Sequence, residues 1–267
     1  PERVHIQNSG RNGGYGFGNN VGFRLALATE PPPDYFYILN PDCFPDPDAV
    51  EELVDFFRRH PRAGIVGSAA RGEDGNPHCT AFRFPSLQSE FEDGVRLGLV
   101  SRLLAPYRVP IGDEIEERIV DWVGGMSVLI RREVLDEIGF FDEGFFLYFE
   151  ETDLCKRARA AGYDVGYAKR SRVVHIGSAT TGLQSPDTPM PNFWYDSRRR
   201  YFEKNHGVAY RLLADFARLA GESAFRARVR TLGLNRPAKP HFIRDFLRHQ
   251  LRSEATQLMQ RVGKAPL

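Results

Sequence analysis

Hydrophobic residues in the first part of the chain recur with two different periods, which predict strands and helices in alternation. A buried strand is indicated at Tyr35–Leu39, an amphipathic helix follows with apolar positions between Val50 and Phe57, and another strand is indicated at residues 63–67. The order strand, helix, strand is typical of strands joined by crossover helices. We therefore expect an α/β fold with a mostly parallel sheet flanked by helices.

Further elements are predicted on both sides of this segment. They are strands at 4–7, 119–123, 126–130, 165–168 and 172–175, and helices at 21–29, 132–138 and 151–161. Residues 8–20 form a glycine-rich loop, and residues 87–104 form either a weak helix or a loop. From residue 192 onward the pattern is helical. We therefore expect an α/β domain at residues 1–190 and a helical region at residues 191–267.

Acidic residues and one histidine stand where predicted elements begin or end. Asn40-Pro41-Asp42 follows the strand that ends at Leu39, an acidic cluster lies between Glu150 and Asp153, and His175 closes the last predicted strand. Open α/β sheets bind ligands at the carboxyl ends of their strands. Carboxylates and a neutral imidazole suit a divalent cation that holds a phosphorylated ligand, and a second carboxylate can act as a base. The alternatives are a helix-entry turn, a helix-dipole role and a packed histidine.

Length and composition are those of a globular protein with a large core. The chain has 267 residues, of which 42% are hydrophobic and 27% are charged. No apolar run approaches the roughly 18 residues that span a bilayer. The first residues lack the basic and apolar regions of a signal peptide, so we expect a cytoplasmic protein. Three widely spaced cysteines, Cys43, Cys79 and Cys155, indicate reduced thiols rather than a disulfide framework or a zinc site.

Charge is unevenly distributed, although the net charge is only +1. From Arg198 onward there are 16 Lys and Arg against 5 Asp and Glu, so residues 1–197 carry −10. Such a basic region suits an anionic membrane at the inner face of the cell, a pyrophosphate-bearing acceptor, or nucleic acid; a solvated helical face is the alternative. No nucleic-acid-binding motif accompanies these charges, so we expect no nucleic-acid partner.

Several motifs in a fixed order are similar to those of one enzyme family. They are Asn12–Asn20, Leu39–Asp42, Trp122–Arg132, Gly139–Cys155, Val174–His175 and Arg198–Phe202. Across about residues 8–207 the chain resembles the inverting GT-A glycosyltransferases of family 2, particularly their rhamnosyltransferase-like branch. The resemblance implies a Rossmann-like GT-A fold with a basic helical C-terminal extension. It also implies sugar transfer with inversion from a nucleotide-sugar donor, dTDP-rhamnose before a UDP-hexose, to a polysaccharide or lipid-linked glycan.

Enzymes of this family normally open with a further strand, helix and strand that grip the nucleotide base, and this sequence begins after that point. The resemblance thus implies that the domain at residues 1–190 lacks its first βαβ unit of about 40 to 60 residues. A chain without that unit has fewer core strands and an incomplete base pocket. If the protein itself lacks the unit, rather than the sequence starting late, we expect its stability and activity to suffer accordingly.

The resemblance assigns roles to the acidic residues and the histidine. Asp42 and His175 would bind Mg²⁺ or Mn²⁺, which bridges the two donor phosphates. Glu151 stands at the position of the catalytic base, where aspartate is usual in the family, with Glu150 beside it. Asp153 belongs to the same cluster, and support of the helix is its alternative role.

Further residues would contact the donor. They are Asn12, Gly13, Gly16, Asn20, Asn40, Trp122, Gly124, Gly125 and Arg199. The glycines would allow close backbone approach, the indole would stack on a pyranose, and the guanidinium would bind the diphosphate. Tight turns, core packing and a solvated helix face are the alternatives for these residues.

Two other classes of function fit the same residues. One is a metal-dependent nucleotidyltransferase or phosphohydrolase, and the other is a non-catalytic nucleotide- or glycan-binding module. Near the C-terminus Arg244, Arg248 and Arg252 recur at helical spacing beside an apolar stripe, which consists of Phe242, Ile243, Phe246, Leu247 and Leu251. This helix would either lie on an anionic membrane as a peripheral contact or cover the catalytic core.

Overall fold

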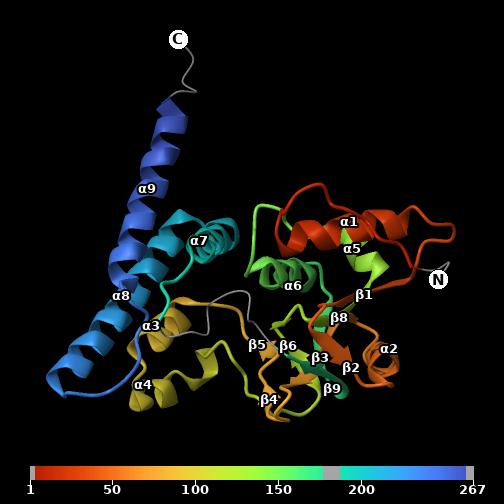
Figure 1. Cartoon of the computed structure of the whole chain (residues 1–267), viewed down its shortest axis with the longest axis horizontal. Helices are drawn as coiled ribbons and strands as arrows, with labels where there is room; N and C mark the ends of the chain where they lie inside the picture. Colours follow the sequence, from red (N-terminus) through yellow and green to blue (C-terminus); the bar gives the residue numbers. More distant parts are fainter. Residues whose placement is uncertain (1–3, 177–186, 263–267) are drawn as a thin grey trace. The chain divides into compact units, whose positions relative to one another are not determined.

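The chain folds into two compact units, which we describe separately. A computed structural model describes residues 4–176 and 187–262 (Figure 1). The first unit comprises Pro1–Ser86 and Pro106–Gly177, and the second comprises Leu87–Ala105 and Ser178–Leu267. Residues 87–105, which the sequence prediction placed in the first domain, thus belong to the helical unit.

A seven-stranded sheet forms the centre of the first unit. Its main strands, in spatial order, are β1 (Tyr35–Leu39), β8 (Ser127–Arg131), β3 (Ala63–Arg71), β9 (Asp164–His175) and β2 (Cys43–Pro45). Two short strands extend it: β4 (Pro77–His78) pairs with β3, and β6 (Arg118–Val120) pairs with β9. A separate two-stranded sheet joins β5 (Ala81–Phe82) to β7 (Trp122–Val123).

The α/β fold is confirmed, but the sheet is mixed rather than mostly parallel. Among the described strands only β3 and β9 pair in parallel. Strands β1 and β3 run in the same direction, as their connection by a helix predicts, but β8 lies antiparallel between them. Val128, Leu129 and Ile130 of β8 are all buried, because a central strand meets apolar layers on both faces.

Helices cover both faces of this sheet. Ile65 and Ile130 pack in the cluster that includes side chains of α1 (Tyr15–Leu27), α5 (Arg132–Ile138) and α6 (Glu150–Ala160). The adjacent residues Val66 and Leu129 pack instead against α2, which spans Ala49–Arg59. Successive side chains of a strand point to opposite faces, so the two clusters lie on opposite sides of the sheet. The flanking helices of the sequence prediction are therefore confirmed.

Three element predictions need correction. Residues 4–7 form no strand, and Val4 and Ile6 are exposed, because no described strand lies beside them to supply hydrogen bonds. Helix α1 begins at Tyr15 inside the predicted glycine-rich loop. Strand β9 is one strand rather than two, because a register shift against β3 is absorbed between Ala168 and Arg172 without ending the pairing.

The second unit is helical. It contains α3 (Leu87–Val95), α4 (Gly98–Leu103), α7 (Asn192–His206), α8 (Val208–Thr231) and α9 (Phe242–Val262). Helices α3 and α8 meet at two glycines. A methyl group on Gly221 would lie 2.6 Å from the Phe91 carbonyl oxygen, and one on Gly94 would lie 2.9 Å from the Arg218 carbonyl oxygen. The two backbones are therefore in direct contact. No helix among residues 4–176 and 187–262 is long and apolar enough to cross a bilayer.

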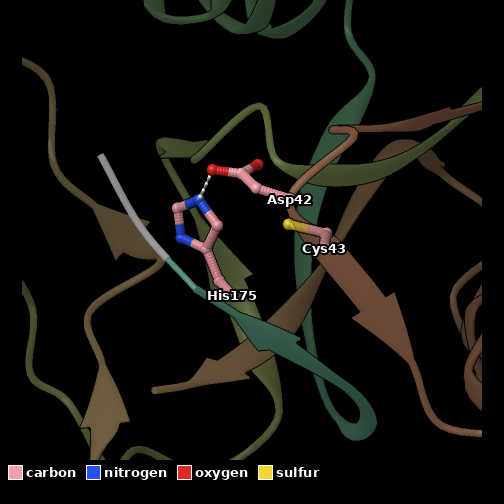
Figure 2. Close-up of side chains that lie close together, drawn as sticks. All are labelled: Asp42, Cys43 and His175. Carbon is pink, nitrogen blue, oxygen red and sulfur yellow. Dashed lines mark ion pairs between the residues drawn. The ribbon is translucent and has the colours of Figure 1, made fainter. Parts of the chain in front are cut away.

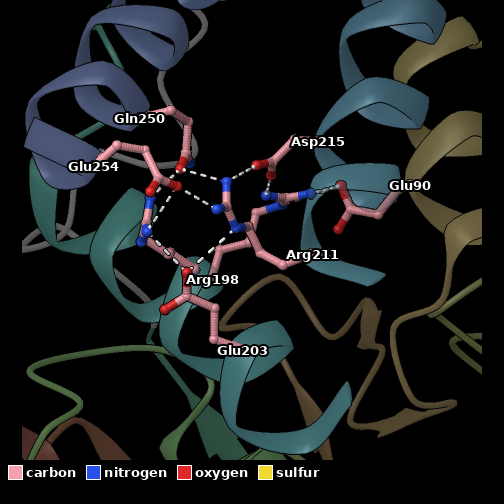
Figure 3. A network of polar contacts seen from close by, with 8 residues as sticks. Glu90, Arg198, Glu203, Arg211, Asp215, Gln250 and Glu254 are labelled. Carbon is pink, nitrogen blue, oxygen red and sulfur yellow. Dashed lines mark hydrogen bonds and ion pairs between the residues drawn. The ribbon is translucent and has the colours of Figure 1, made fainter. Parts of the chain in front are cut away.

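Buried ion pairs hold the helices of this unit together (Figure 3). Arg198 of α7 binds Glu90 of α3 at 3.0 Å and Asp215 of α8 at 2.5 Å, and Arg211 binds the second oxygen of Asp215 at 2.8 Å. Both guanidinium groups are almost completely buried. Because removing one partner would leave a buried charge without compensation, these pairs fix which helices meet.

Arg199 belongs to the same network, which corrects its predicted role as a donor-binding residue. Its guanidinium contacts Glu203 at 2.8 Å, Gln250 at 2.9 Å and Glu254 at 3.0 Å. The side chain is buried and engaged by two carboxylates. The sequence could not distinguish this arginine from one on a solvated face, since both occur at helical spacing.

The apolar stripe predicted on the last helix is divided between core and surface. Phe242 and Phe246 are buried against Tyr195 of α7, with ring centroids 6.0 and 5.7 Å from that of Tyr195. Leu247 and Leu251 are exposed. Packing within the helical unit therefore accounts for part of this stripe.

We predict that Gly221→Ala destabilises the protein, because the added methyl group forces two backbones apart. The expected loss is about 1–3 kcal/mol in the free energy of unfolding, measured by urea denaturation. Gly98→Ala is the matched control, because nothing lies within 4 Å of a methyl group there and alanine favours the helix. Equal stabilities of the two variants would contradict the close crossing of α3 and α8.

Candidate functional site

Three strand ends meet at one edge of the central sheet. Strand β1 ends at Leu39, opposite Ser127 at the start of β8, and the Asn40 amide donates to the Met126 carbonyl oxygen at 2.9 Å. Strand β9 runs in the same direction as β1 and ends at His175. The predicted segments around Asn40 and Gly125 thus lie side by side, as ligand-binding loops of an open sheet do.

Asp42, Cys43 and His175 form a cluster at this edge (Figure 2). Cys43 and His175 are directly opposed in the antiparallel pair of β2 and β9. The His175 Nε2 atom lies 3.4 Å from the Asp42 Oδ2 atom, and one ligand atom of each residue lies within 4.8 Å of the others. The structure therefore brings the two predicted metal ligands together, and their oxygen and nitrogen donors fit a divalent cation.

Sequence reasoning missed two neighbours of this cluster. Burial, and next the charge of Asp42, raise the pKa of the Cys43 thiol to about 12, so the metal-free site holds a neutral thiol. His78 of β4 places its ring centroid 6.3 Å from that of His175 in an edge-on arrangement. The position of Cys43 directly after Asp42 was a signal for the first residue. The sequence carried no signal for His78, because the pairing of β4 with β3 cannot be recognised from the sequence.

Two glutamates open helix α6 beside the sheet. Tyr148 and Phe149, immediately before them, both have a φ of 69°, a left-handed conformation that is costly for aromatic residues. The Oε2 atoms of Glu150 and Glu151 are buried without a hydrogen-bond partner among the described residues. Burial raises the pKa of Glu151 to about 7. Burial, and then the charge of Glu151, raise the pKa of Glu150 well above its usual value.

Such carboxyl groups are suited to proton transfer near neutral pH. Their position after a strained backbone segment is also typical of functional sites, where the surrounding structure maintains an unfavourable conformation. Glu150 is almost fully buried, whereas Glu151 is partly exposed. Glu151 is therefore the better placed of the two to meet a substrate.

Asp153, the third acidic residue of the cluster, anchors the helix instead. Its carboxylate is completely buried and accepts a hydrogen bond from Arg157 Nε at 2.9 Å. The Arg157 guanidinium also donates to the carbonyl oxygens of Ile138 and Phe140 at 2.6 and 2.7 Å. These contacts tie α6 to the segment after α5, which matches the supporting role given to Asp153 as the alternative.

Tyr15 connects the glutamates with the glycine turn before β8. Its hydroxyl donates to the Gly125 carbonyl oxygen at 2.5 Å. Burial, followed by the charges of Glu151 and Glu150, raises the pKa of Tyr15 well above its ordinary value. A methyl group on Gly125 would lie 2.6 Å from the Tyr15 hydroxyl oxygen, so this contact requires glycine. The tyrosine was not selected from the sequence, because an isolated Tyr between glycines carries no signal for either contact.

The glycine-rich segment is mainly explained by packing. Gly14 has a φ of +89°, and a methyl group there would overlap the Phe146 carbonyl oxygen. A methyl group on Gly16 would lie 2.9 Å from the Cβ atom of Phe141. Asn20 is buried, and its amide both donates to and accepts from the Phe141 backbone at 2.9 and 3.0 Å. Gly16 and Asn20, predicted to contact the donor, therefore hold α1 against residues 141–146.

Asn12 and Gly13, unlike Gly16 and Asn20, lie at a surface hollow. Both line a hollow of about 460 Å³ formed by residues 8–14 together with Phe17 and Gly18. The Asn12 side chain accepts a hydrogen bond from the Gly14 amide at 3.2 Å. These two residues stay available to a ligand.

Trp122 and Gly124 belong to the smaller sheet and the turn after it. The Trp122 ring stacks on Phe82 with centroids 4.1 Å apart, and its Nε1 donates to the Arg83 carbonyl oxygen at 2.9 Å. One face of the indole ring and its Nε1–H group are thus engaged by other residues of this chain. At Gly124 the nearest neighbour of a methyl group would be the flexible end of Met126 at 2.8 Å, and Phe82 would lie at an ordinary contact distance of 3.8 Å, so close packing there is less strict than at Gly125.

Comparison with known proteins identifies relatives of the chain. Residues 1–139 match the family described as Glycosyl transferase family 2. The N-acetylglucosaminyl-diphospho-decaprenol L-rhamnosyltransferase of Mycobacterium tuberculosis is 32% identical over 194 residues, which cover 67% of this chain and 61% of that protein. The rhamnosyltransferase WbbL of Escherichia coli is 29% identical over 168 residues, or 61% of each chain. The chain thus spans about 61% of the length of these two relatives.

Among solved structures, a mannosyltransferase from Pyrobaculum calidifontis in complex with GDP-Man and Mn²⁺ superposes with a TM-score of 0.48 at 13% identity, over 92% of this chain and 60% of that one. The match of more than half the chain to one family and the similarity to two rhamnosyltransferases agree with the motifs of the sequence. The chain belongs to glycosyl transferase family 2, in its rhamnosyltransferase-like branch.

Proposed function

We propose that this chain transfers a sugar from a nucleoside diphosphate donor to a hydroxyl group of an acceptor, with inversion at the anomeric carbon. The observation that carries the proposal is Glu151, a carboxyl group with a pKa of about 7 and a buried oxygen that has no partner among the described residues. It lies in the same unit as the Asp42 and His175 pair. A base and a site for a divalent cation are the two parts that such a transfer needs.

In this reaction Glu151 accepts the proton of the acceptor hydroxyl as its oxygen attacks the anomeric carbon. The bond to the donor phosphate breaks on the opposite side, and no covalent enzyme intermediate forms. Asp42 and His175 would hold Mg²⁺ or Mn²⁺, which neutralises the negative charge of the departing diphosphate when bound. Tyr15 keeps the glycine turn at Gly125 next to the glutamates.

The substrates follow from the relatives. The mycobacterial relative is named for an acceptor in which a diphosphate links a sugar to decaprenol, and both reported relatives are rhamnosyltransferases. We therefore extend the proposal to dTDP-rhamnose as donor and a lipid-linked or polysaccharide glycan as acceptor.

Such an acceptor would bring the protein to the inner face of a membrane. Exposed Leu247 and Leu251 on α9, between the exposed Arg244, Arg248 and Arg252, fit a peripheral contact with anionic lipid.

We expect Glu151→Gln to lower turnover by about 10² or more while donor binding is retained, because the amide keeps the shape but cannot accept the proton. Turnover is measured by release of the nucleoside diphosphate with acceptor present, and donor binding by calorimetry. Asp153→Asn is the matched variant for a structural role, and it should lower thermal stability through loss of the Arg157 contact. Normal turnover in Glu151→Gln would remove Glu151 as the base.

The pH dependence of the reaction gives an independent test. The base must be deprotonated, so kcat/KM should rise about tenfold per pH unit on the acidic side and level off above pH about 7, the pKa of Glu151. Because Glu150 is adjacent, the apparent pKa belongs to the pair. A limb centred near the usual glutamate value would show that the base is not this buried carboxyl group.

We predict that His175→Ala weakens Mn²⁺ binding in the presence of a nucleoside diphosphate by at least about tenfold, since one of the protein ligands is lost. Isothermal calorimetry measures this without turnover. His60→Ala is a suitable control, because His60 packs against Phe56 on α2 with ring centroids 4.3 Å apart. Unchanged Mn²⁺ affinity in His175→Ala would show that the histidine has a packing role.

A further inference from the structure

The cluster at the end of β9 contains a sulfur atom as well as an oxygen and a nitrogen donor. Cys43 Sγ lies within 4.8 Å of both the Asp42 and the His175 ligand atoms, and Figure 2 shows it directed toward the space beside them. The side chain is 5% exposed, so strand β2 fixes it rather than leaving it free in solvent. Nothing in the proposed transfer uses this thiol.

The geometry suits a small tetrahedral ion. Zinc ligands lie about 2.0–2.3 Å from the metal, which places neighbouring ligand atoms roughly 3.5 Å apart. The His175 Nε2 and Asp42 Oδ2 atoms are already 3.4 Å apart. Since the sulfur lies within 4.8 Å of both of these atoms, it needs to approach them by at most about 1.3 Å, which a rotation about one side-chain bond can supply.

The three donors also differ in the ions that they prefer. Mg²⁺ and Mn²⁺ favour carboxylate oxygen, whereas thiolate with imidazole is the set that selects Zn²⁺ and similar ions. The same residues thus offer two ligand sets to two classes of metal.

We propose that Cys43, together with Asp42 and His175, forms a binding site for soft divalent ions such as Zn²⁺, which compete there with Mg²⁺ or Mn²⁺. Cys43 then determines the metal selectivity of the site. The inference depends on the proposed function in one respect, which is that Asp42 and His175 hold the catalytic ion.

Co²⁺ is the probe, because cobalt bound to a thiolate has a charge-transfer absorption band in the near ultraviolet. The purified full chain is titrated with Co²⁺ and then with Zn²⁺, and the expected result is a band that appears with Co²⁺ and is displaced by Zn²⁺. Cys43→Ser should abolish the band and weaken Zn²⁺ binding by at least about tenfold, while Mn²⁺ affinity changes by less than about twofold. His175→Ala should weaken both ions.

Cys79→Ser is the matched control. Cys79 is half-buried, and its thiol donates to the Ala81 carbonyl oxygen at 3.3 Å, so its removal should leave the cobalt band unchanged. Cys43→Ala serves as a second variant if Cys43→Ser does not fold, as judged by circular dichroism. A band that persists without Cys43, or no band in the unmodified chain, would overturn the proposal.

The outcome is separable from that of the proposed function. Cobalt absorption and Zn²⁺ affinity are measured without a sugar donor, so they report on Cys43 even if no transfer occurs. Conversely, sugar transfer supported by Mn²⁺ with no Cys43-dependent cobalt band would retain the transferase and exclude this role for the thiol.

Discussion

Strand β8 runs antiparallel between β1 and β3. Its first residue therefore lies beside the last residue of β1. The pairing of Leu39 with Ser127 places the Gly124–Gly125 turn beside Asn40 and the segment that leads to Asp42. Strand β9, which pairs in parallel with β3, adds His175 at the same edge. Each of these side chains comes from a different part of the sequence. The order of strands therefore assembles the site, and no local motif could do so alone.

The site is assembled at a cost to stability. At the start of α6 two adjacent glutamates each have one carboxyl oxygen buried without a partner among the described residues, after two aromatic residues in the left-handed conformation. For Glu151 the folded pKa lies above the unfolded value, so the native state binds the proton more tightly. Stability from this group is complete below the usual glutamate pKa and declines as pH rises toward about 7. The charged form that can act as a base is thus the form that the fold tolerates least.

Sequence patterns were sufficient for local structure and for the family. Strand β1 and helix α5 follow directly from apolar runs and their ends, and the ordered motifs between Asn12 and Phe202 identify the family. The position of β8 between β1 and β3 could not be predicted from such patterns. A continuous apolar run indicates that a strand is buried on both faces, but it does not indicate which strands lie beside it. Cys43 and His78 were missed for the same reason, because pairing between distant strands sets their neighbours. Tyr15 was missed because it meets Gly125 through the packing of helix α1, which no local pattern shows. Arg199 shows the converse limit, because a basic residue at helical spacing gives the same sequence pattern whether its side chain is solvated or buried in an ion-pair network.

The ion pairs of the helical unit have a consequence for the order in which the chain can fold during synthesis. Arg198 bonds to Glu90, 108 residues earlier, and strands β6, β7, β8 and β9 are all made in the interval. Helix α3 therefore leaves the ribosome before Arg198 of α7 and Arg218 of α8, which bind its Glu90 and Asp93 in the folded unit. Domains emerging in sequence tend to fold as units. The helical unit can assemble only after residues 106–177, the second part of the α/β unit, have been translated.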